Sequence, residues 1–428
     1  MTRRASDSRW PIDVITRLRG SGPRRIAQTA DIVLERGQGS YVYSNTGRRY
    51  LDLIAGHGVA ALGHCHPRWV EAVVGQARRL TVTPLHTAEW AEYLQALAGV
   101  LPPRVARAAL FSTGAESVEA AIRLAQTASG RPGVLTFEHS FHGKTLGVRY
   151  AGDLNSPEAR LLGPDWLQAA SFPACERHDA VEYGDCEEPV DDLIATLAGR
   201  ADLAELGAVL VEPVLGTAGN IPPRRPFLPE LRRLCDARGW LLVLDESITG
   251  FGRTGELFAA SYFAVEPDVL VLGKGMGGGL PFGAVCASAE LWESSALSSP
   301  SATSSSFGGN PLACVAGLAT LEIVASDDFL ETVRGVADHA ARSLRQLADA
   351  SPAVGRPRGV GLMLGFDLLD PDDGGFASAD RCAAVFRACR DRGVLLLADV
   401  PRVRLSPPLT IARSEIDELF GVLHEVLV

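Results

Sequence analysis

The feature that most constrains the fold of this chain is an alternation of short apolar runs with helical stretches, which begins near Arg107. Residues 116–127, for example, carry apolar side chains at helical spacing. The apolar runs are short enough to be buried strands. They occupy residues 109–111, 134–137, 208–211, 241–244, 269–272 and 284–287. This alternation predicts an α/β fold in which helices cover a mostly parallel sheet.

The pattern changes after a Ser- and Pro-rich stretch at residues 298–306, which is typical of a loop. The later residues predict a smaller α+β domain, and a hairpin expected around Asn45-Thr46-Gly47 would join it. Its expected elements are helices at 312–324 and 328–350 and strands at 360–368 and 393–397. We therefore expect an N-terminal segment, 1–59, that joins the small domain, a large domain, 60–305, and a C-terminal small domain, 306–428.

Charge and cysteine usage narrow the class of partner. The 428 residues carry a net charge of -10 without a separate basic block, so a nucleic-acid or membrane partner is disfavoured and a small molecule is expected. A polar N-terminus and the absence of a long apolar run favour a cytoplasmic protein. Eight cysteines without a CxxC pair indicate buried thiols. We expect no metal site, because His64-Cys65-His66 fits a turn before Pro67 better.

Only two lysines occur in the chain, Lys144 and Lys274. Lys274 follows the apolar run 269–272 and has glycines on both sides. A lone lysine at a strand end is usually a solvated edge residue. Here the glycines let another group approach the backbone, and the apolar strand end disfavours the ammonium form. A neutral amine is nucleophilic enough to form a Schiff base, so Lys274 is a candidate for covalent cofactor binding.

The same glycines offer a competing interpretation. Gly273, Gly275 and Gly278 match the G-x-G-x-x-G pattern of dinucleotide-binding proteins. Pro281 follows where that motif requires a helix to open, so a nicotinamide-dependent oxidoreductase is only weakly indicated.

Two other strand ends carry candidate ligand-binding groups. Asp245 follows the run 241–244, and a carboxylate there could pair with a pyridinium nitrogen. For Glu246 a structural ion pair, for instance with Arg253, is the better interpretation. Gly114 lies in a turn before a helix, where backbone N–H groups bind phosphate, although an ordinary N-cap by Thr113 explains the same residues.

Taken together, these segments resemble the class III (ornithine and 4-aminobutyrate type) aminotransferases of the fold type I pyridoxal-phosphate superfamily. The resemblance runs from about Gly37 to Leu409. The matching motifs are Leu62-Gly63-His64 with His66-Pro67, Phe111 to Glu119, Phe141-His142-Gly143, Glu212-Pro213-Val214, Asp245-Glu246, Thr249 to Gly255, Lys274, Phe307 to Pro311, and Arg404 with Pro407-Pro408-Leu409.

The resemblance implies pyridoxal 5'-phosphate as cofactor and assigns the residues that hold it. Lys274 would carry the cofactor as a Schiff base, and Asp245 would pair with its pyridine nitrogen. Gly114 and Ala115 would donate backbone N–H groups to its phosphate, and Phe141 would stack on its ring.

The resemblance also implies a homodimer with shared sites, in which Ser306 reaches the phosphate held by the neighbouring subunit. Arg404 would bind a substrate carboxylate.

Three positions depart from the family. Ser247 and Ile248 stand where Val and Gln are usual, beside the cofactor ring. Thr217 replaces a Glu that often pairs with the carboxylate-binding arginine, so neither ornithine nor 4-aminobutyrate is named as substrate.

The sequence thus predicts a transaminase that moves an amino group from a glutamate-like donor to a carbonyl acceptor in a biosynthetic pathway. An aminomutase, epimerase or decarboxylase on the same scaffold remains the alternative. A non-catalytic binding protein is disfavoured by the presence of Lys274, Asp245 and Gly114 together.

Overall fold

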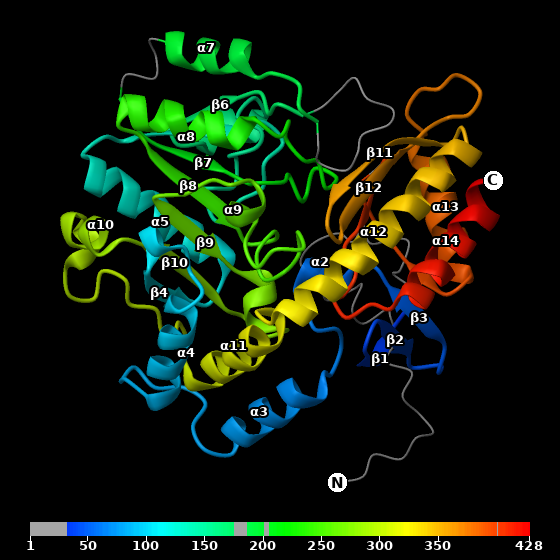
Figure 1. Cartoon of the computed structure of the whole chain (residues 1–428), viewed down its shortest axis with the longest axis horizontal. Helices are drawn as coiled ribbons and strands as arrows, with labels where there is room; N and C mark the ends of the chain where they lie inside the picture. The colour runs from blue at the N-terminus through cyan, green and yellow to red at the C-terminus, as the bar shows by residue number, and fades with distance from the viewer. Residues whose placement is uncertain (1–31, 175–185, 201–204, 400) are drawn as a thin grey trace.

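A computed structural model describes residues 32–174, 186–200, 205–399 and 401–428 (Figure 1). Its largest element is a seven-stranded sheet with the order β4-β10-β9-β8-β7-β5-β6. The strands are β4 (Arg107–Phe111), β5 (Gly133–Phe137), β6 (Leu167–Ala170), β7 (Leu206–Val211), β8 (Leu241–Glu246), β9 (Val269–Leu272) and β10 (Gly283–Ala287). β10 pairs antiparallel with both β4 and β9, and the other described pairs in this sheet are parallel. The α/β fold and all six predicted strands are confirmed.

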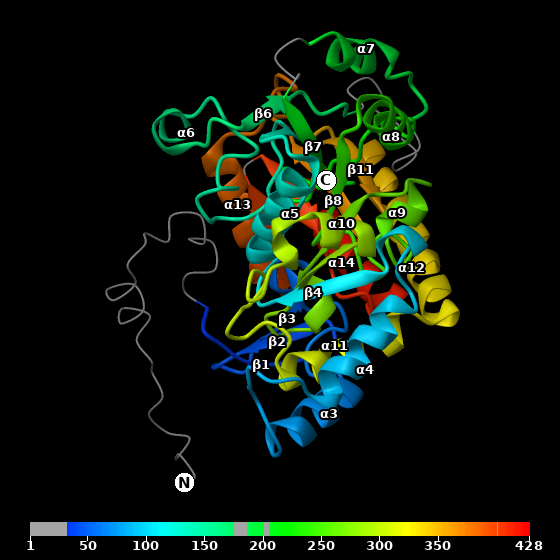
Figure 2. The same ribbon diagram turned by 90° about the vertical axis from the view of Figure 1, so that its left-hand side faces the viewer.

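Both faces of this sheet are buried, because successive side chains of a strand point to opposite faces. Along β8, Val243 packs in one apolar cluster, whereas Leu242 and Leu244 pack in the other. α5 (Gly114–Ser129) covers the first face together with α10 (Ala289–Ser294), and these helices stand before the sheet in Figure 2. α8 (Phe227–Arg238) packs into the second cluster. The sheet is therefore a rigid core with its strand ends held in place.

A second group of elements forms two four-stranded sheets, β11-β12-β15-β14 and β1-β2-β3-β13. Their strands are β1 (Leu34–Gln38), β2 (Tyr41–Ser44), β3 (Arg49–Asp52), β11 (Val354–Val360), β12 (Met363–Leu368), β13 (Val394–Leu395), β14 (Leu397–Asp399) and β15 (Arg402–Leu405). The predicted hairpin is present, and Gly47 at its tip has φ of 82°. β3 pairs in parallel with β13, so the first and last parts of the chain share a sheet.

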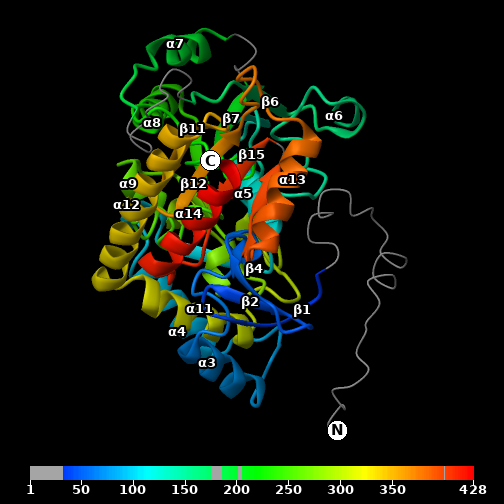
Figure 3. The ribbon, with the colours of Figure 1, turned by 90° about the vertical axis from the view of Figure 1, so that its right-hand side faces the viewer.

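Three long helices pack beside these sheets. They are α12 (Asp327–Ala350), α13 (Ala379–Asp391) and α14 (Arg413–Leu427). α12 and α14 lie side by side in Figure 3 and contact each other along their length. α11 (Pro311–Val324) packs instead against α3 (Pro67–Ala77) and α4 (Ala88–Ala98). The two predicted helices at 312–324 and 328–350 are confirmed, while the domain boundaries near residues 60 and 306 stay a prediction.

Two sequence-based expectations in the C-terminal third were wrong in detail. The strand expected at 360–368 is divided between β11 and β12 by a turn at Gly361, whose φ is 56°. A Cβ there would lie 2.4 Å from the carbonyl oxygen of Arg253, so only glycine fits this turn. The strand expected at 393–397 is likewise divided between β13 and β14.

The remaining α-helices are short: α2 (Ala55–Gly58), α6 (Pro157–Leu162), α7 (Asp191–Gly199) and α9 (Ala259–Tyr262). Within the described ranges, none of the helices combines the length and the apolar character needed to cross a membrane.

Candidate active site

The candidate site lies where the ends of β8 and β9 meet the start of α5. A Cβ added at Gly114 would lie 3.1 Å from Ser247 Oγ, and one added at Gly273 would lie 3.4 Å from Gly114 Cα. Larger side chains at these two glycines would push the three segments apart. The glycines expected to allow close approach therefore bring the helix N-terminus next to Lys274 and Asp245.

Lys274 opens a short 3-10 turn, Lys274–Gly277, directly after β9. Its φ is 38°, in the left-handed region, and its side chain is partly buried. Burial lowers the pKa of the Lys274 ammonium, and the charge of Arg404 lowers it further, although Asp245 and Glu212 oppose this. The lowered pKa means that Lys274 is a neutral amine in a larger fraction of the molecules, and the neutral amine is the nucleophilic form. No α-helix begins here, so the turn lacks the geometry of the dinucleotide-binding motif.

Asp245 is the penultimate residue of β8 and is only 4% exposed. His142 Nδ1 lies 2.8 Å from its Oδ2, and the backbone N–H of Ser247 donates to its Oδ1 at 3.0 Å. Burial alone would raise the pKa of Asp245, but the hydrogen bond from His142 and the charge of Lys274 outweigh burial and lower it. The side chain is therefore held as a carboxylate.

Sequence reasoning missed His142 as an individual site residue. It follows β5 in the Phe141-His142-Gly143 motif, and its side chain is fully buried against Asp245. Thr136 Oγ1 lies 3.5 Å from the other ring nitrogen, Nε2. The motif was the available signal, but it did not reveal which carboxylate the histidine contacts.

Glu246 faces away from Asp245 and holds a loop in place. It accepts three hydrogen bonds, from the backbone of Ala259 (2.6 Å) and Ala260 (2.8 Å) and from the Thr249 hydroxyl (3.2 Å). Burial raises the pKa of Glu246 to about 7. The role is structural, as expected, but the expected ion pair with Arg253 is wrong, because the donors described for Glu246 are uncharged. Arg253 donates instead to the carbonyl oxygens of Leu362 and Pro407.

The start of α5 is capped by Thr113 and leaves N–H groups that could bind an anion. Thr113 Oγ1 accepts from the backbone N–H of Glu116 at 3.1 Å and caps the helix. The first backbone N–H groups of a helix, here those of Gly114 and Ala115, have no acceptor within the helix and can bind an anion. Ser305 donates to Glu116 Oε1 at 2.8 Å, which ties the 298–306 loop to this helix end. Ser306, the next residue, is exposed.

The remaining site residues come from three other segments. The backbone N–H of Phe141 donates to Oε1 of the buried Glu212 at 2.8 Å. Burial raises the pKa of Glu212, against the opposing effect of His142. Arg404 lies on β15, is 7% exposed, and donates from Nη1 to the carbonyl oxygen of Gly216 at 3.4 Å. The charge of Arg404 is one of the influences that lower the pKa of Lys274.

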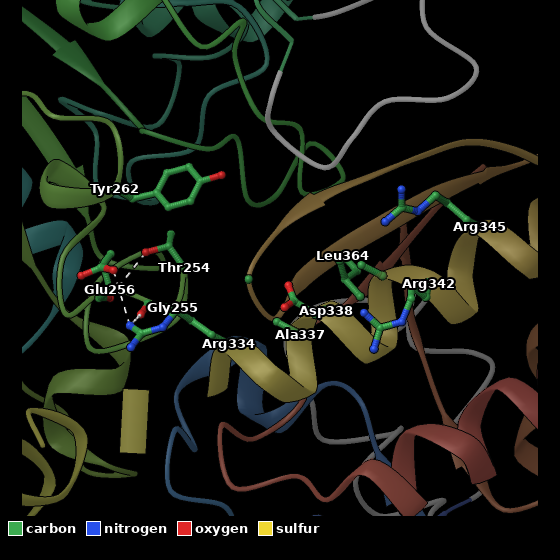
Figure 4. Close-up of a pocket in the computed structure, with 12 residues that line it drawn as sticks. Thr254, Gly255, Glu256, Tyr262, Arg334, Ala337, Asp338, Arg342, Arg345 and Leu364 are labelled. Atoms are coloured by element: carbon green, nitrogen blue, oxygen red, sulfur yellow. Dashed lines mark hydrogen bonds and ion pairs between the residues drawn. The ribbon is translucent and has the colours of Figure 1, made fainter. Parts of the chain in front are cut away.

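A separate cavity of about 480 Å³ lies between the 254–262 loop and α12 (Figure 4). Arg334 spans one edge of it and donates to the carbonyl oxygen of Gly255 at 2.8 Å. Tyr262 lies on the opposite wall from Arg342 in the view of Figure 4. The expected site residues do not line this cavity, so it is distinct from the Lys274 site.

Comparison with known proteins places the chain in a family. The family model described as "Aminotransferase class-III" matches residues 23–427. A (LysW)-aminoadipate semialdehyde transaminase of Deinococcus radiodurans is 36% identical over 93% of this chain and 86% of that protein. An acetylornithine aminotransferase of Methanothermobacter thermautotrophicus is 35% identical over 92% of this chain and 94% of that protein.

Solved structures agree with these relatives. An N-acetylornithine aminotransferase from Stenotrophomonas maltophilia matches with a TM-score of 0.75 and 28% identity, over 97% of this chain and 98% of that one. An (S)-enantioselective omega-transaminase from Thermomicrobium roseum matches with a TM-score of 0.84 and 26% identity, over 96% of both chains.

The site chemistry suits the cofactor of that family. An amine with a lowered pKa, a buried carboxylate and a helix N-terminus are matched to an aldehyde, a basic ring nitrogen and a phosphate. Glycine at positions 114 and 273 leaves the backbone at the helix N-terminus uncovered by side chains of its own. The chain therefore belongs to the class III aminotransferases, and it is a pyridoxal-phosphate-dependent transaminase of fold type I.

Proposed function

We propose that this transaminase takes its amino group from a glutamate-like donor and delivers it to an aldehyde on a biosynthetic amino-acid intermediate. The observation that carries the donor assignment is the placement of Arg404, a buried guanidinium whose charge acts on Lys274. The acceptor class is supported by relatives named for aminoadipate semialdehyde and acetylornithine.

Each site residue has a separate role in binding the cofactor or in moving the donor proton. Pyridoxal phosphate, when bound, supplies an electron sink for the negative charge that develops at the donor Cα. The Lys274 amine would hold the cofactor covalently and, when free, would take the proton from the donor Cα and return it to the cofactor. The Asp245 carboxylate would pair with the protonated ring nitrogen. The N–H groups of Gly114 and Ala115 would hold the phosphate.

One aromatic residue and one hydroxyl residue complete this assignment. Phe141 would cover one face of the cofactor ring. The exposed Ser306 reaches the phosphate in a second copy of the chain, so we propose a homodimer with shared sites. The division into domains at residues 60 and 306 and a cytoplasmic location belong to the same proposal.

Arg404 selects the donor by binding its α-carboxylate in a bidentate pair. Thr217 lies in the same loop as Gly216, whose carbonyl oxygen accepts from Arg404. A threonine hydroxyl cannot neutralise a guanidinium as a glutamate would. With threonine at this position, a donor carboxylate has no glutamate side chain at 217 to displace, and a simple monoamine lacks the carboxylate for the bidentate pair.

The cofactor-binding lysine can be tested directly. Borohydride reduction of the loaded enzyme, followed by peptide mass mapping, should place the modification on Lys274. Lys274→Ala should lose the near-visible absorbance of the bound cofactor, whereas Lys144→Ala, the matched control, should keep it. Modification of Lys144 would overturn the assignment.

The donor is tested by single-turnover conversion of the cofactor absorbance, with glutamate and with a monoamine. Wild type should prefer glutamate, and Arg404→Ala should raise its apparent KM strongly while changing the monoamine reaction much less. Arg392→Ala, an arginine outside the candidate site that pairs with Glu425, is the control for general damage. Equal losses for both donors would contradict the role of Arg404. Failure of glutamate alone to convert the cofactor would instead favour an aminomutase, epimerase or decarboxylase.

A further inference from the structure

Glu212 joins two segments that lie on different sides of the site. It follows β7 and is 5% exposed. Its Oε1 accepts from the backbone N–H of Phe141 at 2.8 Å, and its Oε2 accepts from the backbone N–H of Gly216 at 3.1 Å. Each carboxylate oxygen thus holds one segment. A glutamine could accept at only one of these two positions, because its amide nitrogen is a donor.

Gly216 continues the connection toward the small sheet, because its carbonyl oxygen accepts from Arg404 Nη1 at 3.4 Å. The rest of its loop is fastened to the same sheet. Ala218 accepts from Arg402 at 3.0 Å, Gly219 accepts from Arg358 at 2.9 Å, and Asn220 donates to Leu364 at 2.8 Å. The loop at residues 216–220 is therefore attached to the small sheet, whereas Glu212 directly follows a strand of the central sheet.

Packing leaves the Gly216 peptide little freedom. A Cβ at Gly216 would lie 2.6 Å from Ile248 Cδ1 and 3.5 Å from Glu212 Oε2. Ile248, one of the residues that depart from the family pattern, thus leaves no room for a side chain at the residue whose peptide Glu212 holds. The loop is therefore closely packed at Gly216 as well as hydrogen-bonded there.

We propose that Glu212 is a positioning residue that fixes the distance between the cofactor side of the site, at Phe141, and the donor side, at Arg404, with Gly216 as the link. This inference rests on the roles proposed above for Phe141 and Arg404. The donor carboxylate sets where its Cα lies relative to Lys274, and a misplacement of about 1 Å can cost roughly a hundredfold in rate. Glu212 acts on the reaction without touching the donor.

The test is a double-mutant cycle of Glu212→Gln and Arg404→Ala, read by single-turnover conversion with glutamate and with a monoamine. Glu212→Gln should slow the glutamate reaction by about ten- to a hundredfold, the effect of one lost buried hydrogen bond. In the Arg404→Ala background the same change should have little further effect on glutamate. Additive losses, or equal losses for both donors in the single variant, would overturn the proposal.

Cofactor affinity and the thermal midpoint are measured in parallel, because Glu212 also holds Phe141. Gly216→Ala is the second variant in case Glu212→Gln does not fold. It should displace the loop and reduce the preference for glutamate. An unaltered preference would overturn the inference. If Arg404→Ala alone weakens the glutamate and monoamine reactions equally, the proposed function fails rather than the link through Gly216.

Discussion

Replacing His142 by leucine tests whether this histidine sets the ionisation of Asp245. The substitution removes the N–H that lies 2.8 Å from the carboxylate and leaves the Ser247 backbone N–H as the remaining donor described for Asp245. Hydrogen bonds to charged groups contribute about 1.5 to 3 kcal/mol. The Asp245 carboxylate should then be roughly ten- to a hundredfold easier to protonate, since 1.36 kcal/mol is about a factor of ten.

The assay is the apparent Kd of pyridoxal phosphate for the apoprotein, titrated from about pH 8 to about pH 5. In wild type the lowered pKa of Asp245 keeps the carboxylate charged across this range, so affinity should be retained on acidification. In His142→Leu the affinity should begin to fall at a higher pH. His142→Asn is the matched control, because its amide can still donate near the position of Nδ1. Superimposable profiles for wild type and His142→Leu would refute the reasoning.

Three further predictions concern Asp245, Glu246 and Gly361. Asp245→Asn should bind the cofactor more weakly than wild type and, when saturated with it, should slow the single-turnover reaction with glutamate by roughly one to two decades, because a neutral amide cannot balance the ring charge; unchanged turnover would remove Asp245 from the mechanism. Because burial raises the pKa of Glu246 to about 7, its stabilising effect is complete below about pH 4.5 and is lost as the pH rises through 7. The thermal midpoint of wild type should therefore fall relative to that of Glu246→Gln over this interval, and parallel midpoints would contradict this. Gly361→Ala should lower the calorimetric midpoint by the equivalent of at least about 1 to 2 kcal/mol, because its φ is 56° and its Cβ would meet a carbonyl oxygen; an equal midpoint would show that this turn relaxes freely.

The central sheet could be predicted because each buried strand is a continuous apolar run, and β5, β7, β8, β9 and β10 all have this property. β6 was missed because Leu167–Ala170 contains a glutamine and is only half buried at the sheet edge. β15 was missed because Arg402 and Arg404 interrupt its apolar residues. A strand that mixes arginines with apolar residues lacks the continuous apolar run by which the other strands were recognised.

The candidate site was predictable where a local pattern carries the chemistry. Lys274 stands between glycines after a buried strand, and Asp245 is the penultimate residue of the next strand of the sheet. The partners of these residues were not predictable. His142 and Asp245 are separated by 103 positions, and Glu212 contacts Phe141 across 71 positions. Such contacts depend on which strands become neighbours, which no local pattern specifies. The same limit explains why Arg253 was paired with Glu246 in error.

The pairing of β3 with β13 has a consequence for how the chain is made. Residues 49–52 emerge from the ribosome early, but residues 394–395, their partners in the sheet, are synthesised near the end. At about 5 to 20 residues per second, translation of the residues between them takes on the order of tens of seconds. Until then β3 is an open edge that can pair with other chains. The hydroxyls of Ser40 and Tyr41 donate to Glu415 and Glu418 of α14, which are synthesised even later, so these hydrogen bonds also form late. The N-terminal hairpin can therefore complete its sheet only after synthesis of the chain is nearly finished, and a nascent or truncated chain presents this edge to chaperones.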